Sequence, residues 1–267
     1  MKRTGRLPVP GADLYFEVDG TGPAVVLVHG FSLDGRMWDE QIPALRDIAT
    51  VIRYDARGFG RSSTPELGVD YVPSTDLVAI LDHLGIENAV LVGQSMGGFV
   101  ALHTAVAAPS RVRGLVLLDA LLDGIEWDAD SDIAMENAST AMVNDGVAAG
   151  KRVWLGHPIF APARRSDGLA ARLEVETELW TGFQWTHKDP RAPVHPSPFA
   201  SLEQIAAPTT VVIGELDVPC FHVMAEEMAR RIPGARLITI PDAGHMVNLE
   251  SPDLVNAVLR EAVGAIR

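Results

Sequence analysis

A series of short runs of apolar and β-branched residues sets the strongest limit on how this chain can fold. Runs this short, bounded by turn residues, are typical of strands buried on both faces, and such strands form parallel sheets. The runs lie at residues 14–18, 24–28, 51–54, 89–92, 115–118, 209–213 and 237–240. Segments with helical periodicity lie between them, at residues 74–84, 96–108, 221–231 and 252–266. This alternation predicts an α/β fold with a mostly parallel, doubly wound sheet.

The alternation stops between residues 121 and 198. That stretch has no apolar strand run, and it contains two helical patterns, at residues 131–147 and 166–180. We therefore predict one α/β core formed by residues 1–120 and 199–267, with residues 121–198 inserted as a helical lid (cap). A second independent domain is the alternative, but the stretch is short and both of its ends return to the same sheet.

Composition excludes several classes of function. Lys and Arg number 22 against 35 Asp and Glu, so the formal net charge is −13. This charge argues against a nucleic-acid binder and against docking on an anionic membrane. The single cysteine, Cys220, excludes an internal disulfide and any metal site built from several thiolates. With no signal-peptide pattern and no membrane-length apolar run, we expect a cytoplasmic protein acting on a small molecule without a metal or cofactor.

The most informative motif is a G-x-S-x-G pentapeptide, Gly93-Gln94-Ser95-Met96-Gly97, placed between an apolar run and a helical pattern. A serine on a sharp strand-to-helix turn needs neighbours without side chains, because the turn is strained and crowded. Such a turn lifts the Ser95 hydroxyl clear of the sheet and aims the first N–H groups of the helix at a reacting carbonyl. Ser95 is therefore the predicted nucleophile.

A serine nucleophile needs a base that a third group orients. Asp217 and His245 each follow an apolar run, and the order serine, aspartate, histidine is the one used on this architecture. Asp119, which also follows a run, is the alternative acid, whereas Glu215 is expected to be a solvated loop charge. The other histidines are expected in structural or exposed positions: His29, His83, His103, His157, His187, His195 and His222.

His29-Gly30-Phe31 follows the run at residues 24–28. A backbone N–H beyond that strand can face the N–H of the residue after the nucleophile. We therefore predict that the N–H groups of Phe31 and Met96 form an oxyanion hole. His29 is expected to hydrogen-bond backbone and shape this loop.

Together these motifs make the chain resemble the α/β-hydrolase fold superfamily, and in particular the small bacterial esterases, enol-lactonases and cofactor-free haloperoxidase relatives. The resemblance implies a serine triad without a cofactor. Dehalogenases and epoxide hydrolases carry aspartate where this chain has Ser95, and carbon–carbon bond hydrolases usually carry proline in place of Arg57. The matching segments are residues 29–31, 55–62, 93–98, 214–217 and 244–245.

These features predict hydrolysis of a small to medium, uncharged carboxylic ester through an acyl-enzyme. The same triad also serves lactonases, acyltransferases or perhydrolases, and carbon–carbon bond hydrolases, and a ligand receptor on a retired hydrolase fold is the non-catalytic alternative. The oligomeric state, including a homo-oligomer, is left open. The predicted substrate-binding residues are Trp127, Trp154, Trp180, Trp185 and Val218.

Overall fold

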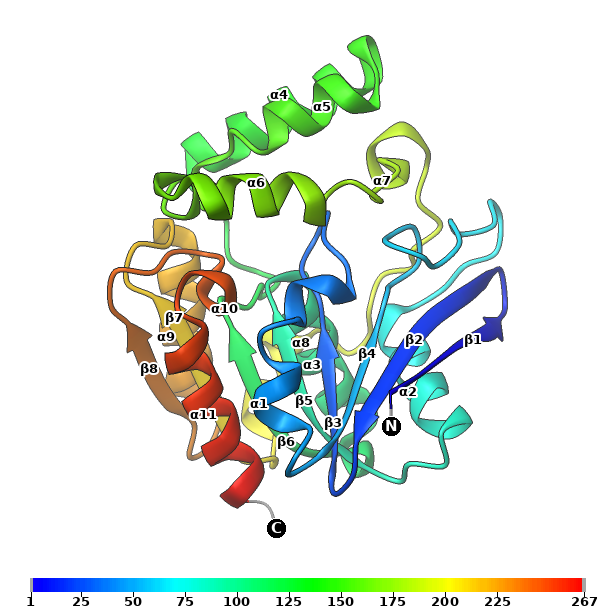
Figure 1. Ribbon diagram of the computed structural model, residues 1–267, viewed down its shortest axis with the longest axis vertical. Helices are drawn as coiled ribbons and strands as arrows, with labels where there is room; N and C mark the ends of the chain where they lie inside the picture. Colours follow the sequence, from blue (N-terminus) through cyan, green and yellow to red (C-terminus); the bar gives the residue numbers. More distant parts are fainter. Residues whose placement is uncertain (1, 266–267) are drawn as a thin grey trace.

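A single twisted sheet runs through the centre of the computed structural model, which describes residues 2–265 (Figure 1). In this part of the chain the sheet has eight strands in the order β1-β2-β4-β3-β5-β6-β7-β8. The strands are β1 (Arg3–Val9), β2 (Ala12–Gly20), β3 (Ala24–Val28), β4 (Thr50–Tyr54), β5 (Ala89–Gln94), β6 (Val112–Leu118), β7 (Thr209–Gly214) and β8 (Arg236–Ile240).

The pairing is antiparallel at one edge and parallel everywhere else. β1 and β2 form a hairpin, and β2 also pairs antiparallel with β4. From β4 to β8 every pair is parallel, so the carboxyl ends of β3 to β8 meet along one edge of the sheet. That edge is where a ligand site of an open α/β sheet is expected.

Helices cover both faces of the sheet, as the doubly wound prediction requires. α1 and α11 pack on one face, and α2, α3 and α9 lie behind the sheet in the same view (Figure 1). The helices of the core are α1 (Ile42–Leu45), α2 (Pro73–His83), α3 (Met96–Ala107), α8 (Pro198–Ser201), α9 (Pro219–Arg231), α10 (Val247–Glu250) and α11 (Pro252–Ala265).

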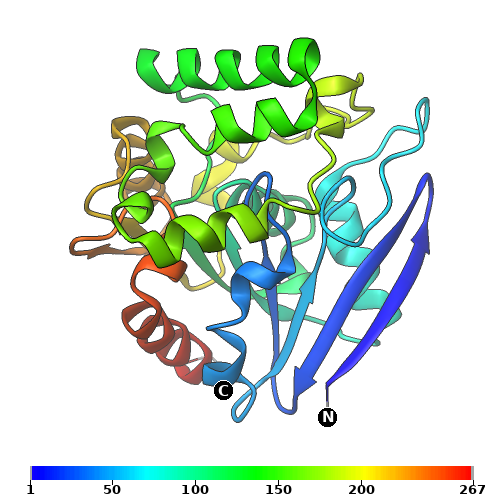
Figure 2. The same cartoon turned by 45° about the horizontal axis from the view of Figure 1, so that its top comes forward.

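The inserted segment lies across the carboxyl ends of the strands, on top of the sheet in Figure 1 and nearer the viewer in Figure 2. Its helices are α4 (Ala129–Asp145), α5 (Val147–Trp154), α6 (Asp167–Glu176) and α7 (Phe183–Thr186). α4 and α5 pack against each other as a helical hairpin. No helix of the described residues is long and apolar enough to cross a membrane.

Several predicted boundaries were wrong for identifiable reasons. The pattern at residues 131–147 predicts one helix, but Gly146 adopts φ +93° and separates α4 from α5. The helix predicted at residues 166–180 is shorter in the structure, where α6 ends at Glu176. β1 was missed because its side chains are exposed or half-buried and form no apolar run. β8 is an edge strand with exposed residues, not a strand buried on both faces. Residue 266 of the predicted last helix lies outside the described residues.

Candidate active site

Ser95 stands on a strained turn between β5 and α3. Its backbone has φ +52° and ψ −116°, a conformation that L-residues rarely adopt. The turn is held on both sides, because the Ser95 N–H donates to the Leu118 carbonyl at 3.0 Å and the Leu121 N–H donates to the Ser95 carbonyl at 3.0 Å. A Cβ on Gly97 would lie 2.1 Å from the Val28 carbonyl oxygen, so only glycine fits there. The G-x-S-x-G spacing is therefore required by packing.

The His245 side chain makes a buried hydrogen bond to Asp217. The two residues follow β8 and β7, and His245 Nδ1 lies 2.8 Å from Asp217 Oδ2. Both side chains are almost completely buried. The other carboxylate oxygen of Asp217 accepts a hydrogen bond from the Val218 N–H at 2.7 Å, so this carboxylate is fixed at both ends.

Asp119, the alternative acid, lies nearby in a different role. It is fully buried after β6, and its Oδ1 accepts a hydrogen bond from the Gly214 N–H at 2.8 Å. Burial and the neighbouring Asp217 carboxylate raise the pKa of Asp119 well above its usual range. The structure pairs the His245 ring with Asp217, and Asp119 braces the backbone where β7 ends.

Two polar residues that the sequence analysis did not single out hold the histidine loop. Glu250 accepts hydrogen bonds from the N–H groups of Gly244 and Met246, each at 3.0 Å, and so clamps the residues on both sides of His245. Gln94 donates its amide to the His245 carbonyl oxygen at 2.8 Å. Neither residue carries a local sequence signal, because both act across long sequence distances or on backbone groups.

The two N–H groups of the predicted oxyanion hole are available to donate to a ligand. Among residues 2–265, neither the Phe31 N–H nor the Met96 N–H donates a hydrogen bond. His29 sits below this loop, where its Nδ1–H donates to the Gly30 carbonyl and its Nε2 accepts from the Ala56 N–H. That tautomer follows from the two partners, and it agrees with the structural role predicted for His29.

A cavity of about 190 Å³ lies between the strand ends and the inserted helices, with Ser95 and His245 both on its wall. Three of the predicted substrate-binding residues, Trp127, Trp154 and Trp185, line it. Most of the other lining side chains are apolar. Those that sequence analysis missed are Leu121, Met135, Ile159, Phe160 and Met246, together with Arg191.

Two predicted substrate-binding residues are not among the lining residues. Trp180 is fully buried, with its Nε1 donating to Gln184 Oε1 at 2.9 Å. Its ring packs edge-to-face with Trp185, at a centroid distance of 4.8 Å. Val218 is half-buried and occupies the N-cap position of α9.

Phe31 connects the core loop to the inserted helices through an aromatic cluster. Its ring makes contacts with Trp154, Trp180 and Trp185 at centroid distances of 5.8, 5.2 and 5.4 Å. Trp154 is also anchored by a hydrogen bond of 2.7 Å from its Nε1 to Ser32 Oγ. Edge-to-face packing of this kind is favourable beyond simple burial, so the loop and the helices are firmly joined.

His103 and His157, two further buried histidines, are held in other hydrogen bonds. His103 Nδ1 lies 2.7 Å from Ser74 Oγ. His157 accepts from the Ile159 N–H and donates to the Ser131 carbonyl, and burial lowers its pKa. These partners explain both residues as structural.

The fold and the strand-to-helix turn that carries Ser95 define the class of protein. Residues 23–252 match the model of the α/β hydrolase fold family, and the chain belongs to this family. It is similar over almost its whole length to solved hydrolases of several activities. A thermophilic esterase from Thermogutta terrifontis is 28% identical with a TM-score of 0.81, covering 99% of both chains. A bromoperoxidase from Bacillus anthracis is 26% identical with a TM-score of 0.82, covering 99% of this chain and 100% of that one. Est816, described as an N-acyl homoserine lactone degrading enzyme, is 29% identical with a TM-score of 0.77, covering 96% of this chain and 99% of that one.

Proposed function

We propose that this chain is a serine hydrolase that cleaves small to medium carboxylic esters. The observation that carries the proposal is the buried His245–Asp217 pair, joined at 2.8 Å, whose histidine lines the same cavity as Ser95 on its strained turn. A nucleophile, a base and an orienting acid from three separate strand ends are the elements of acyl transfer.

The first half of the reaction forms an acyl-enzyme. Ser95 Oγ attacks the ester carbonyl while His245 Nε2 takes its proton, and Asp217 holds the tautomer with hydrogen on Nδ1. The carbonyl oxygen becomes negatively charged as the tetrahedral intermediate forms, and the N–H groups of Phe31 and Met96 bind it. His245 then protonates the departing alkoxide.

The second half returns the free enzyme. A water molecule takes the place of the alcohol, and His245 removes a proton from it as the water attacks the acyl carbonyl. Collapse of the second tetrahedral intermediate breaks the bond to Ser95 Oγ, which recovers its proton from His245. No redox step is involved, and every proton that His245 takes up is returned within the cycle.

The inserted helices serve in this proposal as a lid that sets substrate size. Trp127, Trp154 and Trp185 bring indole rings from this segment to the cavity wall. The cavity volume of about 190 Å³ suits a compact ester better than an ester with a long acyl chain. Size selection and chemistry are then divided between the lid and the core.

Labelling with a fluorophosphonate tests the nucleophile directly. We expect stoichiometric modification of Ser95, located by peptide mass spectrometry. Ser95→Ala should abolish the label and lower kcat for ester hydrolysis by about 10⁴–10⁶. Ser139→Ala, at a serine that does not line the cavity, is the matched control and should label normally. A chain that stays unlabelled, or a Ser95→Ala variant that keeps more than about a tenth of the activity, refutes the proposal.

Lactone opening is the second activity that an observation favours, because the chain resembles a lactone-degrading enzyme at 29% identity. A lactone is an internal ester, so the same steps apply and the alcohol remains attached to the acyl group. A panel of matched esters and lactones with equal carbon number separates the two. A kcat/KM at least tenfold higher for the open-chain esters is the result expected here, and the reverse order assigns a lactonase.

A further inference from the structure

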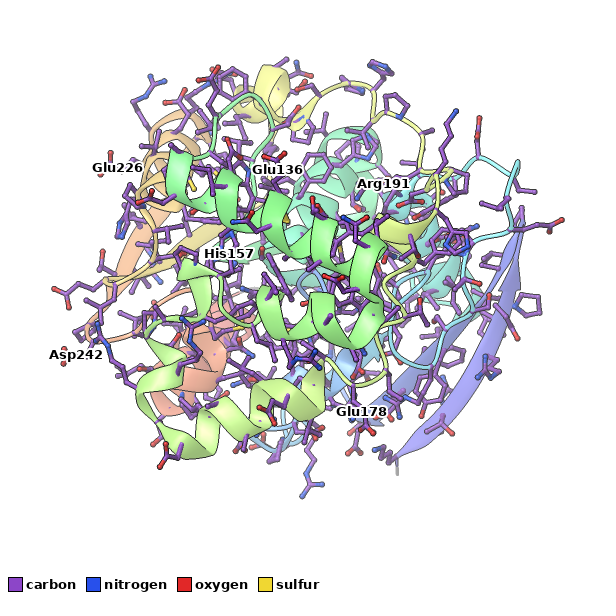
Figure 3. All side chains as sticks on the ribbon, turned by 90° about the horizontal axis from the view of Figure 1, so that it is seen from above. Glu136, His157, Glu178, Arg191, Glu226 and Asp242 are labelled. Carbon is purple, nitrogen blue, oxygen red and sulfur yellow. The ribbon has the colours of Figure 1, made fainter. Side chains whose placement is uncertain are left out.

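Arg191 places a cationic side chain at the wall of the catalytic cavity, on a backbone that is held in place. It lines the same cavity as Ser95 and His245, and no other lysine or arginine of the described residues does so. Its backbone forms an isolated parallel bridge with Tyr71, and the neighbouring Ala192 N–H donates to the Tyr71 carbonyl at 2.8 Å. Figure 3 labels Arg191 at the side of the inserted helices, on the connection that leads from α7 back to the core.

Among the described residues, the guanidinium of Arg191 has no carboxylate partner within hydrogen-bonding distance. The carboxylate closest to it belongs to Asp189, at 4.0 Å from Arg191 Nε, which is too long for a hydrogen bond. Asp189 is already engaged, since its Oδ1 accepts from the Tyr71 hydroxyl and from the Arg191 N–H, each at 3.1 Å. Within residues 2–265 the Arg191 side chain donates no hydrogen bond, and it is 49% exposed.

Buried arginines in this structure have close carboxylate partners. Arg57, for example, is buried and makes two hydrogen bonds to the Asp76 carboxylate, at 2.6 and 2.7 Å. An arginine that faces an apolar cavity without such a partner keeps its planar set of donors available to a ligand. The ligand group that matches this fork in shape and charge is a carboxylate, which it can bind through two parallel hydrogen bonds.

Resting on the proposed ester hydrolysis, we infer that the substrate carries a carboxylate away from the scissile carbonyl, and that Arg191 binds it at the mouth of the cavity. The sequence analysis predicts an uncharged substrate, and the net charge of −13 repels anions at long range. Arg191 supplies a local exception to that field. It is a specificity residue, and the triad chemistry does not use it.

Matched substrate pairs test this inference. One series contains 4-nitrophenyl monoesters of dicarboxylic acids, with the carboxylate on the acyl side, each paired with its methyl-capped neutral counterpart. A second series places the carboxylate on the alcohol side, as acetate esters of hydroxy acids paired with their methyl-capped forms. In at least one series the wild-type kcat/KM should favour the anionic member by about tenfold or more, mainly through KM.

The Arg191→Met variant should lose this preference, and Arg191→Lys should keep part of it, since lysine retains the charge without the fork. Arg152→Met is the matched control, because Arg152 is an exposed arginine on α5 that does not line the cavity, and it should keep the wild-type ratio. Thermal unfolding verifies that each variant is folded. Equal ratios in wild type and Arg191→Met, in both series and at every chain length, overturn the inference.

A binding measurement separates this inference from the proposed function. In Ser95→Ala, calorimetric titration with glutarate monoamide reports carboxylate binding without turnover. We expect binding that weakens by about tenfold or more in the Ser95→Ala, Arg191→Met double variant. Loss of this binding difference refutes the role of Arg191 even if esters are cleaved. Its presence supports the role even if ester cleavage fails.

Discussion

The side-chain amide of Gln94 donates to the backbone carbonyl of His245 at 2.8 Å, across 151 positions of sequence. Gln94 directly precedes Ser95 and is fully buried, as is His245. This hydrogen bond ties the loop of the proposed base, His245, to the strand that leads to the proposed nucleophile, Ser95, independently of Asp217. The proposed mechanism needs Ser95 and His245 within hydrogen-bonding distance of each other, and this bond joins their two segments next to that point.

Replacing Gln94 should therefore damage catalysis more than stability. In Gln94→Leu one neutral hydrogen bond is lost, for which about 1–3 kcal/mol of unfolding free energy is expected. A loop shift near 1 Å can cost about 10²-fold in rate, so we expect kcat to fall by about 10–100-fold with KM within about threefold. Steady-state kinetics and urea unfolding on the same samples check this. An unchanged kcat would show that Asp217 and Glu250 suffice to place His245.

The acid of the triad can be identified by comparing two aspartates. Asp217→Asn should lower kcat by about 10⁴, because an amide cannot hold the His245 tautomer or stabilise the imidazolium. Asp119→Asn should cost less than about tenfold, since an amide oxygen still accepts from the Gly214 N–H. Both are measured as kcat on one ester. The opposite ranking would assign the acid to the end of β6.

The inserted helices should control chain-length preference through Trp127. This residue lines the cavity and packs on Phe221 at a centroid distance of 5.4 Å. Trp127→Ala should shift the best acyl or alkoxy length and change relative kcat/KM by about tenfold to a few hundredfold. Ile133→Ala, at an exposed position on α4, is the control and should keep the parent profile. An unchanged profile in Trp127→Ala would move size selection to the strand-end loops.

Stability should fall as pH rises through the titration of Glu176. Burial, only partly offset by Arg172, raises the pKa of Glu176 from 4.5 to about 7. Its neutral form is favoured in the folded state, so this stabilisation is complete below about pH 4.5 and is lost as pH rises through about 7. The loss is on the order of 1–3 kcal/mol.

Glu176→Gln keeps the neutral shape and should remove most of this pH dependence. Urea unfolding at pH 5 and pH 8 gives the free energy of unfolding of wild type and variant. The variant should be more stable relative to wild type at pH 8 than at pH 5. Glu174→Gln, at an exposed position of the same helix, is the control. If the two stability profiles of Glu176→Gln and wild type ran parallel, Glu176 would be ionised in the folded state throughout.

Local patterns were enough to predict the central strands and the sharp strand-to-helix turn at Ser95. β3 was predicted to the residue, because an apolar run bounded by turn residues has one register, and the Ser95 turn is encoded within five positions. The β1 strand and the break at Gly146 were missed, since an exposed edge strand has no apolar run and one glycine does not disturb a periodic pattern. Arg191 could not be predicted, because its position depends on a bridge to Tyr71 that no short-range pattern encodes.

Phe31 takes part in two functions at once, since its N–H faces the proposed oxyanion site and its ring is packed by three tryptophans of the inserted helices. A change at Trp154 or Trp185 that resizes the cavity should therefore also displace the proposed oxyanion donor. Random libraries at these indoles should yield variants in which altered substrate range and slower turnover occur together. Separating the two would need a compensating change at Phe59, whose ring supports Phe31 from the core side at 5.6 Å. The route by which this scaffold acquires new substrates thus passes through paired substitutions, one on each side of the same phenyl ring.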